Sequence, residues 1–352
     1  MNIDEELSNK ISNMGLVCSC LVVLLHVSQQ IHVRGFGADA LQYCSGHGLG
    51  RCAVPFFFIA SGFFLAGHMH DHGWWRRECV KRLRTLFAPY LFWNVFHWGF
   101  MHLLRIVAGF VGIAFASNIG WKLNLGLNPL DTPQHPHLWF LRTLMISVLI
   151  SPVFVLLKRR ISGAASLLPF VVVCCYLSIK FSSIAMTSEE AFAIRCWFSG
   201  FAFFATGVYL RYNPICLGSL IPRRVTWAIG LPCALLPWIV YVALARHGLT
   251  VTAQAVDVPF VLVSVYFLFE SMPSGSWSRK LTSCAFPIYL IHGMVLILFM
   301  GLFRCIGLKE YLSHCTLLFF IFYYLVVLSV SIGLALLIRK VRILAFFAFG
   351  GR

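Results

Sequence analysis

The sequence predicts an all-α fold, a polytopic integral membrane bundle of about ten transmembrane helices in a single domain spanning residues 1–352. The chain is 59% hydrophobic and only 11% charged, whereas a soluble domain of this length needs far more charge to cover its surface. Apolar stretches of about 18–22 residues recur along the chain, and about 20 residues span the hydrocarbon core of a bilayer. No long polar segment remains, so no appended soluble domain is expected.

The first predicted helix is expected to be retained, because the opening residues Met1–Glu6 lack the basic segment of a cleaved signal peptide. The apolar stretches place the helices at roughly residues 12–32, 52–68, 85–108, 138–157, 164–181, 196–210, 225–245, 255–272, 284–303 and 316–338. An even number of helices brings both termini to the same side of the membrane.

Basic residues are unevenly distributed between the two sides of this predicted bundle. With the N-terminus in the cytoplasm, 18 of the 28 lysines and arginines fall in the inner segments. The positive-inside rule therefore favours a multi-pass protein of the cell membrane with both termini cytoplasmic. This topology accounts for most of the formal net charge of +16. We therefore expect the lipid bilayer, and no nucleic acid, as a partner.

The 13 cysteines scatter singly along the chain, and no CxxC spacing occurs. Many of them lie in or at the ends of apolar runs, where cysteine behaves as a small buried hydrophobic residue. A local zinc or redox centre is therefore not expected. The pairs Cys44/Cys52 and Cys305/Cys315 lie on predicted outer loops, where an oxidising compartment would allow disulfides.

Two histidines, His26 and His292, lie inside apolar runs long enough to cross a membrane. A titratable side chain at this depth faces a protein interior or a water-filled cavity and is functional by default, and imidazole transfers protons near neutral pH. Gly15, Ser19, His26 and Gln30 share one stripe of the first helix. At 1.5 Å per residue, His26 lies roughly 20 Å deep, in the outer half of the bilayer. The alternative is a structural histidine satisfied by a neighbouring helix.

The second predicted helix begins near Arg51, at about the level of His26, and carries Ser61-Gly62. An arginine at this depth is suited to neutralise an oxyanion or to hold an acidic group, although its long side chain can instead reach the membrane interface. Ser61 and Gly62 allow close helix approach or a kink.

The inner segment His70–Arg84 is strongly basic and holds five cations within nine residues, namely Arg76, Arg77, Lys81, Arg82 and Arg84. This density exceeds what orientation in the membrane requires, and arginines bind phosphate groups in a bidentate manner. A phosphate-rich cytosolic ligand would use such a patch. The alternative is positive-inside charge in contact with anionic lipid.

The ninth predicted helix carries Tyr289 and His292, which are three residues apart and share a face. If this helix begins near residue 284, His292 lies about 9–12 Å from the inner surface, and therefore not level with His26.

The fourth predicted helix begins with His137-Leu138-Trp139, at the end of the outer segment Ser117–His137. This segment is long and rich in Gly, Pro and Asn, which makes it a candidate lid or substrate rim. The alternative is an interfacial loop with a tryptophan anchor.

Five motifs, in this order and spacing, resemble the acyltransferase-3 family over nearly the whole chain. They are Leu21–His26, Arg51 with Val54–Gly62, Lys81–Arg84 before Pro89-Tyr90, His137–Leu141, and Ile288–His292. Two positions depart from patterns common in the family. Gly15 stands where many members have Arg or Lys, and Trp139-Phe140-Leu141-Arg142 replaces the Trp-Ser-Leu…Glu motif of one large branch. The sequence Trp139-Phe140-Leu141-Arg142 is similar to that of the family branch that modifies polysaccharides or membrane-linked sugars.

The resemblance implies a membrane-bound O-acyltransferase that moves an acyl group, most often acetyl, from cytosolic acyl-CoA to a hydroxyl of an extracytoplasmic glycan or lipid-linked saccharide. It implies His26 as the catalytic residue, acting as general base or transient acyl carrier, with Arg51 binding the oxyanion. Acyl-CoA, typically acetyl-CoA, is the implied co-substrate, and no metal is expected. The nucleotide would dock on Lys81, Arg82 and Arg84, and the substrate-binding candidates are Ser19, Gln30, Ser61, Trp139, Tyr289 and His292.

The alternative function is a transporter or permease of a small polar molecule, because polar residues inside a helix bundle are also typical of a substrate path through the membrane. However, the sequence contains no evident inverted repeat and no matched pair of broken helices. A purely structural role would leave the buried histidines unexplained.

Overall fold

The computed structural model describes residues 5–35, 37–110, 122–126, 128, 131–154, 156, 172–174, 176–177, 180–181, 187–212, 223–248, 250–308 and 311–351. Over these residues the fold is all-α, as predicted, and β-structure is limited to an isolated bridge between Val33 and Cys315. The helices are α1 (Glu5–Gln30), α2 (Ala38–Gln42), α3 (Ala53–Ala66), α4 (Trp74–Arg82), α5 (Ala88–Phe110), α6 (Trp139–Ile150), α9 (Ser188–Tyr212), α10 (Arg223–Arg246), α11 (Thr250–Glu270), α12 (Arg279–Thr282), α13 (Ala285–Cys305), α14 (Leu317–Lys340) and α15 (Arg342–Phe349).

The predicted helices coincide with these elements, apart from 164–181, which lies largely outside the described residues. The largest differences from the predicted boundaries are at the start of the first helix, at the end of the fourth and at the start of the sixth, α9, which begins at Ser188 and not near residue 196. The first helix begins at Glu5, because Glu5 and Glu6 in its first turn interact favourably with the helix dipole. The fourth ends at Ile150, because Pro152 has no N–H to continue the helical hydrogen bonds.

Within the described part of the chain, five helical segments are long and apolar enough to cross a membrane, namely Glu5–Gln30, Ala38–Ala66, Glu189–Tyr212, Ala285–Phe303 and Leu317–Lys340. The segments Pro136–Ile150, Ala228–Leu244 and Val258–Glu270 are apolar but shorter. The helix α5 is long enough, but polar side chains, including His97 and Arg105, interrupt its apolar run. The chain is therefore a helical membrane protein, and a total of about ten spans stays a prediction.

The ends of helices that were predicted to share the inner side contact one another. The indole nitrogen of Trp75 in α4 donates to the carbonyl of Leu149 at the end of α6 (3.3 Å). The Tyr212 hydroxyl at the end of α9 donates to the carbonyl of Ala66 at the end of α3 (3.3 Å). The guanidinium of Arg339 in α14 donates to the Ser283 hydroxyl before α13 (2.7 Å).

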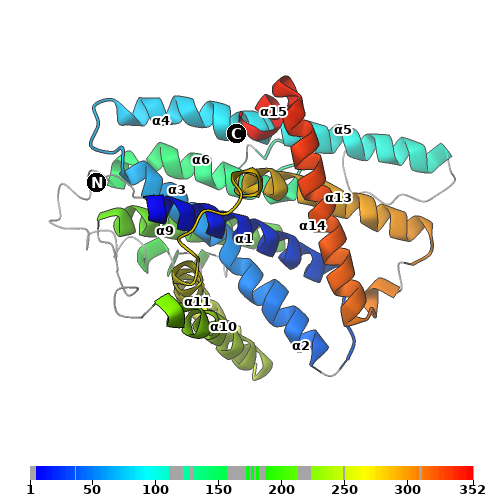
Figure 1. Cartoon of the computed structure of the whole chain (residues 1–352). Helices are drawn as coiled ribbons and strands as arrows, with labels where there is room; N and C mark the ends of the chain where they lie inside the picture. Colours follow the sequence, from blue (N-terminus) through cyan, green and yellow to red (C-terminus); the bar gives the residue numbers. More distant parts are fainter. Residues whose placement is uncertain are drawn as a thin grey trace.

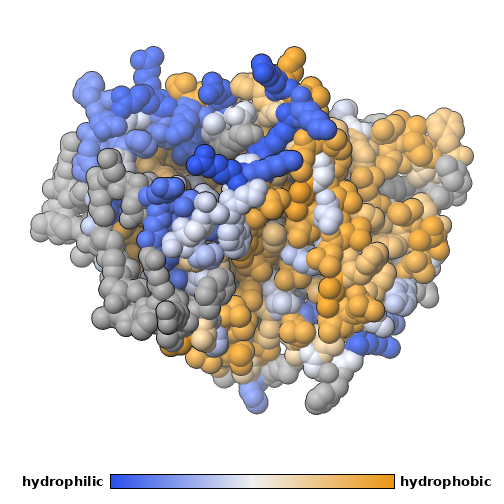
Figure 2. All heavy atoms as spheres, in the orientation of Figure 1, coloured by the Kyte–Doolittle hydropathy of each residue, from blue (hydrophilic) through white to orange (hydrophobic). Residues whose placement is uncertain are grey.

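The outer surface agrees with a membrane environment. Figure 1 shows α4 and α15 along one edge of the molecule, with the long α14 crossing its front. Figure 2 shows hydrophilic residues gathered over α4 and the α15 end of α14, whereas the rest of α14 is hydrophobic. Leu318 and Phe322 of α14 are 78% and 62% exposed. A helix so apolar and so exposed is suited to contact lipid.

Helices α3 and α9 pack closely because each presents a glycine to the other. A Cβ atom at Gly62 of α3 would overlap the carbonyl oxygen of Phe204, and a Cβ at Gly207 of α9 would overlap that of Ile59. Small residues at helix crossings let backbones approach in this way. The contact matters for the site, because α3 also packs against α1.

We predict that Gly207→Val destabilises the protein by about 1–3 kcal/mol or more, because the added carbons force α3 and α9 apart. Thermal unfolding in detergent measures the effect. Gly99→Val on α5 is the matched control, because a Cβ at Gly99 meets nothing within 4 Å. Equal melting temperatures for the two variants would contradict this account of the α3–α9 contact.

Candidate active site

The middle of α1 is joined to the first residue of α13 by a hydrogen bond. The Ser19 hydroxyl donates to the carbonyl oxygen of Ala285 at 2.7 Å. Seven residues beyond Ser19 lies His26, and seven residues beyond Ala285 lies His292. Both helices therefore rise by about 10 Å from the shared point to their histidines.

The histidines of α1 and α13 consequently meet. The ring centres of His26 and His292 lie 5.2 Å apart, with an angle of 24° between the ring planes. The prediction that His292 is not level with His26 is therefore wrong. It assumed that the two helices start at the same depth, whereas α13 begins beside the middle of α1.

A third histidine, His137, completes a cluster with these two. It lies in the short turn Pro136–Leu138 that leads into α6. Its ring centre is 4.1 Å from that of His26 and 5.0 Å from that of His292. One nitrogen from each of the three rings lies within 4.8 Å of the others. We call His26, His137 and His292 the histidine cluster.

The cluster continues into a longer row of imidazoles. His135 lies 5.2 Å from His137, and His97 of α5 lies 4.9 Å from His135, between ring centres. Both are buried, with exposed fractions of 1% and 4%. Complete burial, reinforced by the neighbouring histidines, lowers the pKa of His135, so its ring is neutral at pH 7.

Two rings of the cluster are oriented through Nδ1. The Nδ1 of His26 lies 3.0 Å from Oε1 of Gln29, and the Nδ1 of His292 lies 3.2 Å from the carbonyl oxygen of Ile288. Because these oxygens only accept, Nδ1 carries the proton in both rings and Nε2 keeps its lone pair. The Nε2 of His292 is buried without a hydrogen-bond partner among the described residues.

Gly293 lets the segment with His135 and His137 approach α13 closely. A Cβ atom at Gly293 would lie 2.5 Å from Cδ2 of His137 and 2.8 Å from Cε1 of His135. The Tyr289 hydroxyl of the same helix donates to the carbonyl oxygen of His137. The helix α13 therefore contacts the turn at two positions on one face.

The outer segment that precedes His137 is fixed by a buried arginine. Arg142 of α6 donates through Nη1 to the carbonyl oxygens of Gly126 (2.7 Å) and Asp131 (2.8 Å). Its side chain also lies over the ring of Trp197. On the other side, the amide N–H of His135 donates to Oδ1 of Asn94 at 3.1 Å. These contacts make the described part of the segment an ordered wall of the site.

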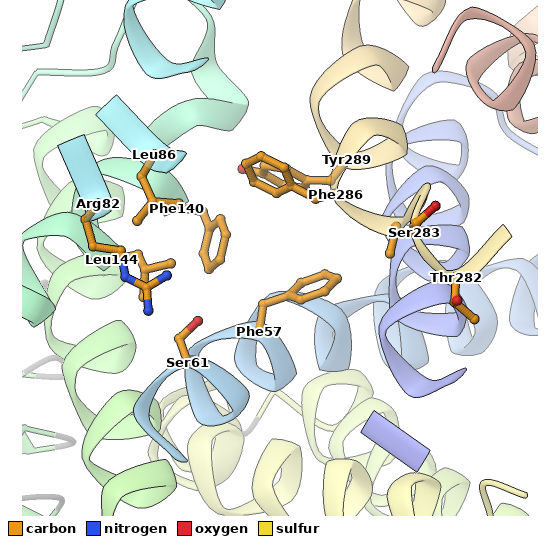
Figure 3. A pocket seen from close by; sticks show the side chains of 11 residues that line it. Phe57, Ser61, Arg82, Leu86, Phe140, Leu144, Thr282, Ser283, Phe286 and Tyr289 are labelled. Carbon is orange, nitrogen blue, oxygen red and sulfur yellow. The ribbon is translucent and has the colours of Figure 1, made fainter. Parts of the chain in front are cut away.

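A cavity of about 200 Å³ lies next to the cluster. Figure 3 shows Arg82 on one side of it and Ser283 with Thr282 on the other. The wall between them is mostly aromatic and aliphatic, and its other lining residues are Phe57, Ser61, Leu86, Phe140, Leu144, Ala285, Phe286 and Tyr289. The ring of Tyr289 lies 6.1 Å from that of His292, so Tyr289 borders both the cavity and the histidine cluster. None of the three cluster histidines lines the cavity itself.

The three basic residues predicted to bind the donor differ in their surroundings. Arg82 lines the cavity and lies 3.3 Å from the carboxylate of Glu78, which is buried. Lys81 is exposed and lies 3.3 Å from the other oxygen of Glu78. Arg84 is exposed and follows α4. Of the three, only Arg82 lines the cavity.

The remaining predicted residues are spread around the site. Ser61 and Tyr289 line the cavity. Trp139 packs on Phe58, with 6.3 Å between ring centres. Gln30 accepts a hydrogen bond from the Tyr323 hydroxyl of α14 at 3.3 Å.

The predicted oxyanion group, Arg51, follows Gly50, which packs on α1 against Leu25 and the carbonyl of Leu21. This contact places the backbone of Arg51 beside the part of α1 that carries His26. The cysteines of the two possible disulfide pairs have free thiols.

The sequence alone assigns no site role to Gln29, His97, His135 or His137. It places His137 at the start of a helix and in one motif of the family resemblance, and it places His135 in an outer loop. The one local sequence signal for these roles was a pair of histidines on either side of Pro136, just before the start of an apolar helix.

The comparisons with known proteins bear on this site. The family model described as an acyltransferase domain, of the acyltransferase-3 type, matches residues 14–340. The matched region contains the whole histidine cluster and the cavity. No curated protein and no solved structure matched the chain.

We predict that Arg142→Gln loosens the outer segment, because carbonyl groups that accept from the guanidinium lose a charged donor, at a cost of about 1–3 kcal/mol. Hydrogen exchange of residues 122–135 should become faster, and the melting temperature should fall. Lys122→Gln is the control, because it removes a charge from an exposed position of the same segment. Unchanged exchange in Arg142→Gln would contradict the anchoring role.

Proposed function

The chain belongs to the acyltransferase-3 family, and we propose that it is a membrane-bound O-acyltransferase that uses acyl-CoA. The acyl group, for which acetyl is the expected case, would pass to a hydroxyl of an extracytoplasmic glycan or lipid-linked saccharide. One observation carries this proposal: the histidine cluster lies beside a cavity whose opposite side holds Arg82. The cluster would activate the acceptor, and the arginine would bind the donor.

The donor would enter the cavity from the side of Arg82. Coenzyme A carries several phosphates, which arginine binds through charge-assisted hydrogen bonds. Its pantetheine arm is narrow and mostly apolar, as are the side chains between Arg82 and Tyr289. Lys81 and Arg84, exposed near the same end, would contact the nucleotide from outside. The thioester would then lie next to the histidine cluster.

His26 would activate the acceptor through Nε2, because its Nδ1 donates to Gln29. As general base, Nε2 takes the proton of the acceptor hydroxyl while the oxygen attacks the thioester carbonyl. The thiolate of coenzyme A leaves and receives that proton. As acyl carrier, Nε2 instead attacks the thioester first and releases the thiolate of coenzyme A. The acyl group then passes to the acceptor oxygen, and the acceptor proton goes to that thiolate. In either case Arg51 would stabilise the oxyanion.

The site would be reached from both sides of a cell membrane, with both termini in the cytoplasm. The donor approaches from the side of α4, where basic residues gather (Figure 2). The acceptor approaches from the side of the outer segment that Arg142 holds in place.

We predict that His26→Gln lowers the rate of acyl transfer by about 10²–10⁴-fold, the range expected for loss of general-base catalysis. Transfer of label from radiolabelled acetyl-CoA measures the rate, and thermal unfolding is recorded on the same preparation. His314→Gln, at an exposed position outside the cluster, is the control. His292→Gln should have a milder effect than His26→Gln.

Two outcomes would count against the proposal. One is near-normal turnover in His26→Gln. The other is a loss of activity that only matches the loss of folded protein, as a structural histidine would produce. Accumulation of an intact solute in vesicles, without label transfer, would favour the alternative of a transporter.

We predict that Arg82→Gln raises the KM for acyl-CoA by about tenfold to a hundredfold, which corresponds to a charged hydrogen bond of about 1.5–3 kcal/mol. The KM for the acceptor should change little. Because Arg82→Gln leaves the buried Glu78 with one fewer partner, the double variant Glu78→Gln/Arg82→Gln separates donor binding from stability. Arg77→Gln, exposed and paired with Asp71, is the matched control. An unchanged donor KM in the folded double variant would favour the anionic-lipid interpretation of the basic segment.

A further inference from the structure

The histidine cluster has the composition and shape of a metal site. His26, His137 and His292 come from α1, from the turn before α6 and from α13, and their rings face one another inside the bundle. We propose that these three residues bind a divalent transition-metal ion, for which Zn²⁺ is the best match. Metal binding rests on the cluster alone and not on acyl transfer.

The spacing of the rings fits zinc coordination. With Zn–N bonds of about 2.0–2.1 Å and ring centres about 1.1 Å behind each nitrogen, a tetrahedral ion separates its imidazole centres by roughly 5 Å. The observed separations are 5.2, 5.0 and 4.1 Å. The nitrogens lie within 4.8 Å of one another, against roughly 3.3 Å around a tetrahedral ion. Binding an ion therefore requires the imidazole rings to turn so that their nitrogens approach one another.

The hydrogen bonds of the cluster prepare Nε2 for coordination. Metal-binding histidines almost always donate their other ring N–H to an oxygen, which fixes the tautomer. His26 does so toward Gln29, and His292 toward the carbonyl of Ile288. The Nε2 of His292 is fully buried, and no hydrogen bond to it occurs among the described residues. A buried polar atom in this state indicates an ion or a water molecule.

The charge of the site determines which fourth ligand the ion would bind. Within the described residues, the metal-binding group consists of histidines and contains no carboxylate. Three neutral imidazoles leave the charge of the ion uncompensated at membrane depth, so the fourth ligand should be anionic. Three histidines with an open fourth position are the arrangement of catalytic zinc, which lowers the pKa of a coordinated hydroxyl group. If the ion is bound, His26 would be a ligand in place of the general base, and the ion would supply the activation of the acceptor hydroxyl.

Metal content tests the proposal on the full chain, purified in detergent without a polyhistidine tag. After chelation and reloading with Zn²⁺, mass spectrometry should find about one ion per wild-type chain. Reloading with Co²⁺ should produce the visible absorption of a tetrahedral complex. His137→Ala should lose the ion and the absorption, whereas His314→Ala, at an exposed position outside the cluster, should retain both.

Adjacent glutamines supply a finer test that leaves all three ligands in place. Gln29→Ala removes the group that orients His26 and should weaken Zn²⁺ affinity by about 10–100-fold. Gln30→Ala is the matched control, because Gln30 bonds Tyr323 of α14 instead. Equal affinities in the two variants would contradict a coordinating role for His26.

Folded wild-type protein that takes up no Zn²⁺, or no more than His137→Ala does, would overturn the metal site. The activity assay separates this result from the proposed function. Acyl transfer by folded protein that takes up no Zn²⁺ would leave the acyltransferase intact and the metal site wrong. One bound ion per chain, without transfer from acetyl-CoA, would leave the metal site intact and the proposed function wrong.

Discussion

The hydrogen bond from the Ser19 hydroxyl to the Ala285 carbonyl sets the register between α1 and α13, and the site depends on that register. A shift of one helical turn would separate His26 from His292 by about 5 Å more along the helix axes. The same register places Gly293 opposite the turn that carries His137. This contact and the packing of α1 against α13 thus bring the three imidazoles together.

Polar atoms inside a membrane protein require partners, and this requirement shapes the wall around the cluster. Arg142 satisfies several carbonyl oxygens of the outer segment, and Asn94 satisfies the amide of His135. Without such partners, irregular backbone near the bilayer core would be costly. The segment is therefore held close to α13, where it supplies His137 to the cluster and a wall to the site.

Features that depend on local sequence were predictable, and features that depend on helix offsets were not. Apolar length located the helices, and helical periodicity put Ser19 and His26 on one interior stripe. The predicted depth of His292 was wrong, because α13 begins beside the middle of α1, where Ser19 contacts Ala285. No periodicity assigns His137 to the cluster, because it lies in a short turn outside the long helices. Cysteine spacing likewise says nothing about a metal site assembled from three distant histidines.

The buried pair of Glu78 and Arg82 also limits how the cavity can work. Glu78 forms ion pairs with Arg82 in the cavity wall and with Lys81 at the surface, so two cations balance its charge. When an anionic ligand binds Arg82, Glu78 still pairs with Lys81. The buried carboxylate is therefore not left unpaired, which would cost several kcal/mol. The arrangement keeps an arginine available beside an apolar cavity while its charge is balanced. Such a group can bind a phosphate at one end of a ligand whose other end reaches the histidines.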